Sequence, residues 1–482
     1  MNFAIIFRVL GLLLMLFSLT LTPPFIVSII YQDGGHTAFI ISFIIIFIIG
    51  LSIWSPVYKS SQDLRTRDGF LITALFWAVL GIAGSLPFML IDHTNLSLTD
   101  AVFESVSGLT TTGATVITGL DNLPQSILFY RQQLQWLGGI GIIVIAVAIL
   151  PMLGIGGMQL YRAEAPGPVK DSKLTPRITE TAKALFLIYL MLTLACAISF
   201  WVAGMSLFDA ICHAFSTVAI GGFSTHDASI GFFQSPVIVT VTIVFMLISG
   251  INFALHFITW QDRSIKQYFT DAECQFYLWC VLAGILITVS YLYFTQTYNF
   301  QHSLLNGTFE LVSLLTTTGF GVADYSLWPG FLPSMLFLFA FMGGCGGSTA
   351  GGIKVIRTML IFKQGQREIY RLIHPNAVIP VKIGNSRVPD RVVESVWGFF
   401  AVYMLSFIVM FLILLGTGLD FVTAFSAVGA CINNLGPGMG DVSAHYGAIK
   451  DTAKWVLAFA MLLGRLEVFT LLVLFTPAFW RH

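Results

Sequence analysis

A short polar run that ends in glycine occurs four times along this otherwise apolar chain. The first and third copies are nearly identical, and the second and fourth are more distant matches. These four strips are Thr110-Thr111-Thr112-Gly113, Ile220-Gly221-Gly222, Thr316-Thr317-Thr318-Gly319 and Asn433-Asn434-Leu435-Gly436. The lead-in segments match as well, since Glu104 and Glu310 stand at corresponding positions before the first and third strips. A unit that recurs along a chain indicates one structural element used several times.

The composition places this element in a membrane. Of the 482 residues, 56% are hydrophobic and only 10% are charged, far from the balance of a soluble domain. Apolar stretches of about 18 residues or more can cross a bilayer as helices. Ten such stretches occur, at about 7–30, 38–54, 70–92, 134–160, 184–205, 236–259, 275–295, 332–363, 394–416 and 454–478. The sequence therefore predicts an all-α polytopic membrane protein.

The spans and strips together predict the domain organisation. Two spans come before the first strip, and the other eight form pairs, each pair enclosing one strip. We expect two extra N-terminal transmembrane helices in 1–68, followed by pore repeats at 69–183, 184–273, 274–393 and 394–482. Each repeat would be a helix, a pore loop and a second helix. Four such repeats would surround one pore in a pseudo-fourfold arrangement.

The basic residues predict how the chain is oriented. Most of the 24 Lys and Arg residues fall in loops on the side of the N-terminus, whereas Arg131, Lys450 and Lys454 fall on the other side. Cytoplasmic loops are the ones enriched in Lys and Arg. We therefore expect cytoplasmic N- and C-termini and four external strips. Several aspartates share the external side, where they would raise the local concentration of cations.

The sequence gives no support to several other function classes. The net charge is zero, so no basic surface indicates nucleic acid. The nine histidines and six cysteines are scattered without catalytic or metal-ligand spacing. We expect no enzyme activity and no organic cofactor, and we expect membrane lipid around the chain.

The strips have the chemistry of a cation pathway. Polar, non-helical backbone is tolerated at membrane depth only where it is buried in protein or lines a water-filled path. Four strips around one axis would present rings of carbonyl oxygens, which can replace the hydration shell of a monovalent cation. Each terminal glycine would permit a positive φ there. The predicted carbonyl ligands belong to Thr111, Thr112, Ile220, Gly221, Thr317, Thr318, Asn433 and Asn434.

Two features of the lead-in segments complete this prediction. The segments should form short helices that direct their negative C-terminal ends at the ion. Glu104 and Glu310 lie in them, and we favour a structural role behind the strips over direct ion binding. The first three lead-ins have equal length, but the fourth, aligned on Ala424-Phe425-Ser426, has about four extra residues, which leaves its register open.

These features resemble a known family. The strips TTTGAT, AIGGFS, TTTGFG and NNLGPGMG, the segment Gln135-Trp136-Leu137-Gly138-Gly139-Ile140-Gly141 and the two N-terminal spans are similar to the Trk/Ktr/HKT superfamily of potassium uptake proteins, bacterial TrkH type. The resemblance covers essentially the whole chain. It implies inward conduction of K⁺, and of Rb⁺, across the bacterial inner membrane with modest selectivity over Na⁺. It also implies a homodimer attached to a cytosolic nucleotide-binding ring called TrkA.

A glycine-rich loop interrupts the second span of the third repeat. Six of the ten residues from 343 to 352 are glycine, which a regular helix does not tolerate. We expect a loop between two half-helices, although a close helix-packing face of small residues is the alternative. The resemblance implies that this loop obstructs the pore. The predicted gate residues are Gly343, Gly344, Gly346, Gly347, Ser348, Thr349, Gly351, Gly352 and Arg465.

Arg465 is a charged residue in the last span. A charge at that depth is costly and marks a functional candidate. Glu467, two positions on, is a poor partner because it lies on a different face of a helix. We hypothesise that Arg465 contacts carbonyls of the glycine-rich loop beneath the strips and adds an electrostatic barrier to K⁺. A buried ion pair between helices is the alternative.

One alternative function, a coupled transporter, stays open at this point, and a membrane enzyme is a more distant one. A K⁺ symporter coupled to H⁺ or Na⁺ would also use broken helices near the membrane midplane. A membrane enzyme would need clustered acidic or histidine side chains, which the sequence does not show. The basic loops at 161–182, 260–273 and 364–393 are candidate docking surfaces for the regulatory ring.

Overall fold

The computed structural model describes residues 2–59, 66–91, 94, 96–144, 178–384 and 386–480. Within them, six helices or continuous helix pairs are long and apolar enough to cross a membrane. They are α1 with α2 (Phe3–Leu19, Thr22–Tyr31), α3 (His36–Trp54), α4 with α5 (Thr66–Ala83, Leu86–Leu90), α10 (Ile178–Val202), α15 (Ala272–Phe294) and α19 (Asp390–Gly416). The all-α polytopic fold predicted from the sequence is confirmed.

Two further spans are sharply bent. One joins α12 (Pro236–Ser249) to α13 (Phe253–Gln261) at 91°, and the other joins α21 (Asp451–Arg465) to α22 (Val468–Leu472) at 115°. The apolar pattern predicts a continuous span at both positions, at 236–259 and 454–478, and this prediction is wrong. Apolar composition alone does not mark these breaks, because the residues on both sides are equally hydrophobic. The predicted span at 134–160 begins within α7 (Gln125–Val144), and the rest of it lies outside the described residues.

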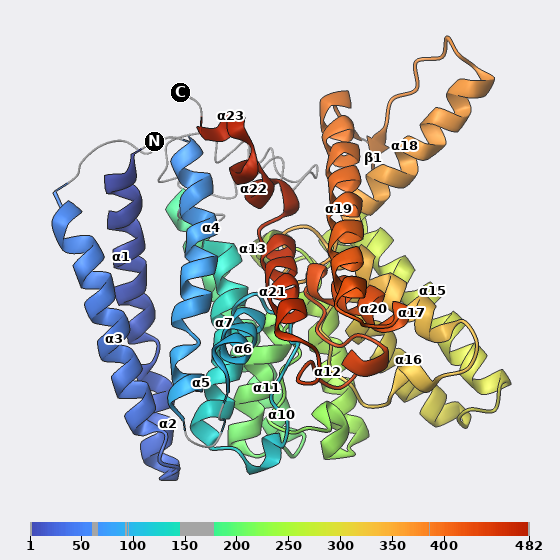
Figure 1. The fold of residues 1–482 in the computed structure, drawn as a ribbon. Coiled ribbons are helices and arrows are strands. Elements are labelled where there is room, and N and C mark those ends of the chain that lie inside the picture. The colour runs from blue at the N-terminus through green and yellow to red at the C-terminus, as the bar shows by residue number, and fades with distance from the viewer. Residues whose placement is uncertain are drawn as a thin grey trace.

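The glycine-rich loop separates two helices, as its composition predicts. Helix α17 (Leu332–Met342) ends at the first glycine, and α18 (Val355–Ile373) begins just beyond the last one. Helix α18 then leaves the helical body and projects beside the upper end of α19 (Figure 1). The segment after it contains a short β-hairpin with two residues in each strand, β1 (Lys382–Ile383) and β2 (Ser386–Arg387), with Ile383 opposite Ser386.

Four short helices lead into the four strips. They are α6 (Leu98–Leu109), α11 (Leu207–Ala219), α16 (Phe300–Leu315) and α20 (Phe421–Ile432). Each begins at a polar residue whose side chain accepts a hydrogen bond from a backbone N–H of the first turn, which is the usual N-cap arrangement. These caps are Ser97, Ser206, Asn299 and Asp420.

The remaining elements are short. The 3₁₀ helices are η1 (Ser55–Val57), η2 (Leu120–Asn122), η5 (Ser229–Phe233), η6 (Tyr325–Leu327), η7 (Gly440–Val442) and η8 (Val473–Phe475). Two short α-helices, α14 (Lys266–Thr270) and α23 (Pro477–Trp480), complete the described structure. Helix α1 begins and α23 ends on the same side of the molecule (Figure 1).

The N-terminal helices form a layer at one edge of the molecule, with α1 and α3 side by side (Figure 1). Gly11 and Gly50 lie at their crossing, where a Cβ on either would clash with the backbone of the other helix. Small residues permit such close approach between spanning helices. The outward faces of the long helices carry exposed residues such as Ile48, Leu194 and Leu286, which is the surface expected against lipid.

Candidate functional site

The four strips form a closed ring. A Cβ added to the glycine of each strip would clash with a carbonyl oxygen of the next strip, in the order first, second, third, fourth and back to first. The four pairs are Gly113 with Gly221, Gly222 with Thr318, Gly319 with Leu435, and Gly436 with Thr112. Segments more than three hundred residues apart, such as the first and fourth strips, therefore meet edge to edge around one axis.

The backbone of the strips repeats with the same conformation. Two residues before each glycine, a residue other than glycine has a positive φ: Thr111 at 54°, Ile220 at 54°, Thr317 at 65° and Asn434 at 53°. The four glycines also have positive φ, between 78° and 100°. Alternation of right- and left-handed residues turns successive N–H groups to one side of a chain. The carbonyls must then face the other side.

Hydrogen bonds show which side takes the N–H groups. The residue before each glycine donates its N–H to a carbonyl of its own short helix, at 2.8 Å in all four repeats. The pairs are Thr112 to Ser107, Gly221 to Ser216, Thr318 to Ser313, and Leu435 to Ala430. The strips thus bind the helices behind them through N–H groups, which leaves the opposite side of each strip to its carbonyls.

These repeats also define the register of the fourth strip. Asn434 and Leu435 occupy the places of Thr111 and Thr112, so the predicted pair Asn433 and Asn434 is displaced by one residue. The four extra residues expected in this repeat are absent when the count begins at the N-cap. Ser97 to Gly113, Ser206 to Gly222 and Asp420 to Gly436 are equally long, whereas the third repeat has one extra helical turn. Alignment on Ala-Phe-Ser matched the wrong turn of the helix.

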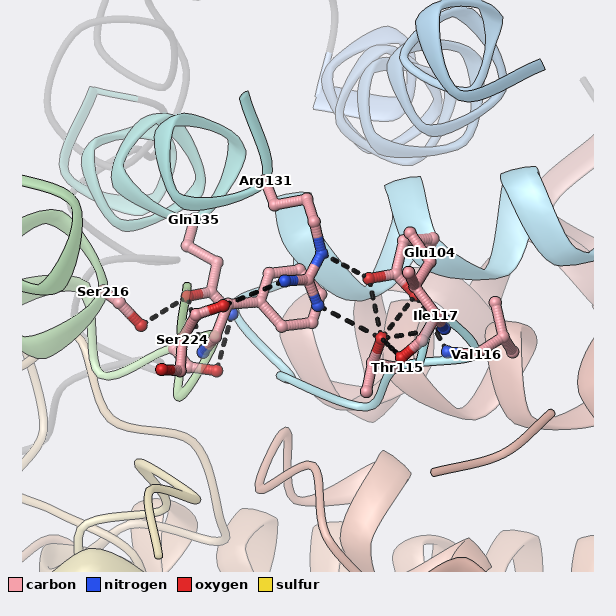
Figure 2. A network of polar contacts seen from close by, with 10 residues as sticks. Glu104, Thr115, Val116, Ile117, Arg131, Gln135, Ser216 and Ser224 are labelled. Carbon is pink, nitrogen blue, oxygen red and sulfur yellow. Dashed lines mark hydrogen bonds and ion pairs between the residues drawn. The ribbon is translucent and has the colours of Figure 1, made fainter. Parts of the chain in front are cut away.

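A buried ion pair supports the first strip. The Arg131 guanidinium, with 1% of its side chain exposed, donates from Nε to Glu104 Oε1 at 2.8 Å. The other Glu104 oxygen accepts the Val116 N–H at 2.9 Å, so the carboxylate holds the backbone that leaves the strip. Arg131 also donates to the Ser224 carbonyl at 3.0 Å and thereby ties the first repeat to the second (Figure 2).

Gln135, one turn further along α7, supports the second strip. Its side-chain oxygen accepts the Ser216 hydroxyl at 2.7 Å and the Phe223 N–H at 3.1 Å, and its amide nitrogen donates to the Gly221 carbonyl at 2.6 Å (Figure 2). The sequence pattern predicts only an external position for Arg131 and no role at a strip. The polar run from 131 to 135, just ahead of an apolar span, was the available signal.

The third strip has a different support. Glu310 accepts the Val322 N–H at 2.8 Å and the Ala323 N–H at 3.0 Å, which places it behind the strip as expected.

A cavity of about 390 Å³ lies at the glycine end of the ring. Its lining includes Arg131, His226, Glu310, Tyr325 and Tyr446. The ring therefore opens into a chamber lined by both polar and apolar side chains.

The glycine-rich loop lies against the opposite end of the ring. Its Gly351 N–H donates to the Thr317 hydroxyl at 2.7 Å, and its Gly352 N–H donates to the Asn433 carbonyl at 3.0 Å. The Thr349 hydroxyl donates to the Val218 carbonyl at 2.9 Å, at the end of α11. The loop therefore contacts the inner ends of the second, third and fourth repeats at once.

Arg465 contacts this loop, as the sequence analysis expected. Its guanidinium donates to the Thr349 carbonyl at 3.1 Å and to the Gly138 carbonyl of α7 at 3.0 Å. Glu467 is not its partner, because it follows the break after α21 and pairs with Arg357 of α18 instead. Within the described residues, the Arg465 charge is thus held by backbone carbonyls beneath the ring.

Comparison with known proteins places this geometry in a family. A family model described as "TrkH: Cation transport protein" matches residues 35–482. The chain belongs to the TrkH family. It is 59% identical over 482 residues to the Trk system potassium uptake protein TrkH of Halomonas elongata, and the match covers all of both chains. The protein of the same name from Escherichia coli K12 is 54% identical over 483 residues, again over all of both chains.

A solved structure agrees with the fold. The crystal structure of the potassium transporter TrkH from Vibrio parahaemolyticus superposes with a TM-score of 0.92 at 52% identity, and all of both chains is covered. The chain is therefore a multi-pass membrane protein of a transport family. This membership confirms the expectation that it is not an enzyme.

Proposed function

We propose that the protein conducts K⁺, and also Rb⁺, through the ring of four strips. The observation that carries the proposal is the closed ring, in which the N–H group before each glycine binds back to its own short helix. The carbonyls on the opposite side of the strips would then surround a common axis. Rings of backbone carbonyls suit a dehydrated monovalent cation. The names of the relatives, potassium uptake protein and potassium transporter, support K⁺ as the ion. The ligands would be carbonyls of Thr111, Thr112, Ile220, Gly221, Thr317, Thr318, Asn434 and Leu435.

The proposal includes an orientation. The distribution of Lys and Arg supports cytoplasmic termini and an inner-membrane location, with the chamber facing outwards. K⁺ would enter the chamber and pass the strips towards the glycine-rich loop. The C-terminal, negative ends of α6, α11, α16 and α20 meet the strips, which favours a cation at that point.

The glycine-rich loop would be the gate. It lies directly under the ring and is held there by backbone and side-chain hydrogen bonds to three repeats. Arg465 adds a positive charge on the proposed path, where it would repel K⁺. Conduction would then require the loop to leave the axis together with, or ahead of, the guanidinium. In this scheme four pore repeats follow two N-terminal helices, at the boundaries given by the sequence.

A regulatory partner follows from the family. The relatives belong to a Trk system, which supports a partner of that system, and we propose a TrkA-type nucleotide-binding ring and a homodimer of this chain. The projecting end of α18 and the hairpin after it offer basic residues such as Arg371 and Arg387 for docking. The predicted docking loop at 161–182 lies outside the described residues except for its last positions.

Flux through purified protein in liposomes tests the proposal. K⁺ and Rb⁺ should pass far better than Na⁺ and Li⁺ and should follow the K⁺ electrochemical gradient alone. Gly113→Ser should erode this preference, because its side chain would meet the Gly221 carbonyl at a φ of 82°. Gly321→Ser is the matched control, since a Cβ there has no neighbour within 4 Å. Transport that requires a proton or sodium gradient would instead identify a coupled symporter.

A further inference from the structure

One hydroxyl of the third strip is bonded to the glycine-rich loop. In the first strip Thr110 pairs with Thr112, and in the third strip Thr316 pairs with Thr318, with 2.7 Å between hydroxyl oxygens in both cases. The middle hydroxyl of the third strip, Thr317 Oγ1, instead accepts the Gly351 N–H at 2.7 Å. Thr317 has no exposed surface, so this bond is shielded from water. A buried donor that loses its acceptor is costly.

The next loop residue binds the neighbouring strip. The Gly352 N–H donates to the Asn433 carbonyl at 3.0 Å, and a Cβ on Gly351 would clash with that same carbonyl. Two successive N–H groups of the loop thus occupy two oxygens at the inner end of the ring. Because oxygens of this kind are also cation ligands, the loop and an ion at the inner end compete for them.

The first strip provides an internal contrast. Thr111 has the same neighbours in sequence as Thr317, the same left-handed backbone and the same burial. Its methyl group faces Gly138 of α7, where a Cβ would lie 3.2 Å away. The structure describes the whole glycine-rich loop, and no N–H group of that loop donates to the Thr111 hydroxyl. The two identical strips differ because one meets a continuous helix and the other meets the loop.

We infer that Thr317 is a positioning residue, whose hydroxyl holds the glycine-rich loop against the ring. Through this contact, displacement of the loop is coupled to ion binding at the inner end of the path. This inference rests on the proposed function. When the loop leaves, the Thr317 hydroxyl and the Asn433 carbonyl lose their donors and become free to face an ion. Coupling of this kind is reciprocal, so an ion at the inner end favours the displaced loop.

Chemical labelling of Cys345 tests the contact without any need for conduction. Cys345 lies in the glycine-rich loop and is buried, so a small cationic methanethiosulfonate reagent reaches it only when the loop is displaced. The rate of modification at this residue is measured by peptide mass spectrometry on protein in liposomes. Thr317→Val removes the acceptor and keeps the shape of the side chain. It should raise the rate about five-fold, the factor expected for loss of one hydrogen bond.

Two control variants decide the interpretation. Thr317→Ser keeps a hydroxyl and should label at the wild-type rate, and Thr111→Val removes the matching hydroxyl of the first strip without accelerating labelling. Equal labelling of Thr317→Val and Thr111→Val, with K⁺ flux intact in the wild type, would overturn the role of Thr317 alone. A misfolded Thr317→Val would label at all buried cysteines, including Cys212 and Cys431, and that result would also overturn it. Absence of K⁺ selectivity in the wild type would overturn the proposed function itself.

Discussion

The first and third repeats reach the same backbone by different chemistry. Both strips are Thr-Thr-Thr-Gly, and a glutamate stands nine residues before the glycine in each. Glu104 pairs with Arg131, whereas Glu310 accepts two backbone N–H groups and has no cationic partner among the described residues. The corresponding position is His213 in the second repeat and Ala427 in the fourth.

The differences at this position show that two sets of residues around a strip have separate structural roles. The strip conformation depends on its own glycine and on N–H bonds to its short helix, which all four repeats share. In the first three repeats, the side chain nine residues before the glycine binds the segment that leaves the strip. His213, for example, bonds to the Ser224 hydroxyl at 2.9 Å. The contacts of that side chain therefore determine how much its substitution lowers the free energy of unfolding.

The sharpest test of this comparison is one substitution at both glutamates. Glu104→Gln leaves the Arg131 charge buried without a counter-charge, which should lower the free energy of unfolding by about 3–5 kcal/mol. Glu310→Gln keeps an oxygen that can accept from Val322 and Ala323, so its loss should be about 1 kcal/mol or less. Denaturant unfolding in detergent micelles measures both. Equal losses would mean that Arg131 does not distinguish the two repeats.

A second test converts the first repeat to the chemistry of the third. Arg131→Met leaves Glu104 with the Val116 N–H and the Thr115 hydroxyl, which is close to what Glu310 has. The loss should be about 3–5 kcal/mol, because the Glu104 carboxylate stays buried without a counter-charge and contacts to Ser224 and to the Phe223 ring also disappear. With Glu104→Gln added, the double variant should lose less than the two single losses combined, by about 0.5–3 kcal/mol. Strict additivity would show that the pair is not coupled.

The difference between a strip and the side chains around it also explains which features of the molecule the sequence could predict. Apolar length and repeated strips sufficed for the helical spans and for the strips, because both signals are local. The expectation that Arg465 meets the glycine-rich loop also held, since a charge in a span has few alternatives to backbone carbonyls. The bend after Arg465 was missed because it depends on packing. Gly464 lies there against the Ile432 carbonyl, and an apolar pattern does not report such a contact.

Arg131 and the fourth strip show the limits more clearly. Arg131 resembles an external loop residue in sequence, yet it is buried because the carboxylate that compensates it comes from another helix. Alignment on Ala-Phe-Ser makes the fourth lead-in about four residues too long, because these residues lie one helical turn away from their structural match. The capping residue Asp420 was the better anchor, since only one position of a helix can be its N-cap.

The smallest predicted effect concerns the segments that follow the two strips. Asp121 of η2 binds His226 of the second repeat, with 2.5 Å between Oδ1 and Nδ1, whereas Asp324 before η6 only caps its own turn at Ser326. Burial would lower the pKa of His226, but the carboxylates of Asp209 and Asp121 outweigh it and raise the pKa above its ordinary value. His213 and Asp227 also lie close to this loop residue.

A raised pKa in the folded state sets the sign of the pH dependence. The stabilisation by protonated His226 is complete below the unfolded-state pKa of about 6.5 and is lost as pH rises through the higher folded-state pKa. Asp121→Asn should therefore reduce the fall in melting temperature above about pH 6.5, with an effect of about 1 kcal/mol or less at the partly exposed pair. Asp324→Asn should leave that pH profile unchanged. If both variants altered the pH profile equally, the cause would be general surface charge. The contact between Asp121 and His226 would then not distinguish the segments that follow the two strips.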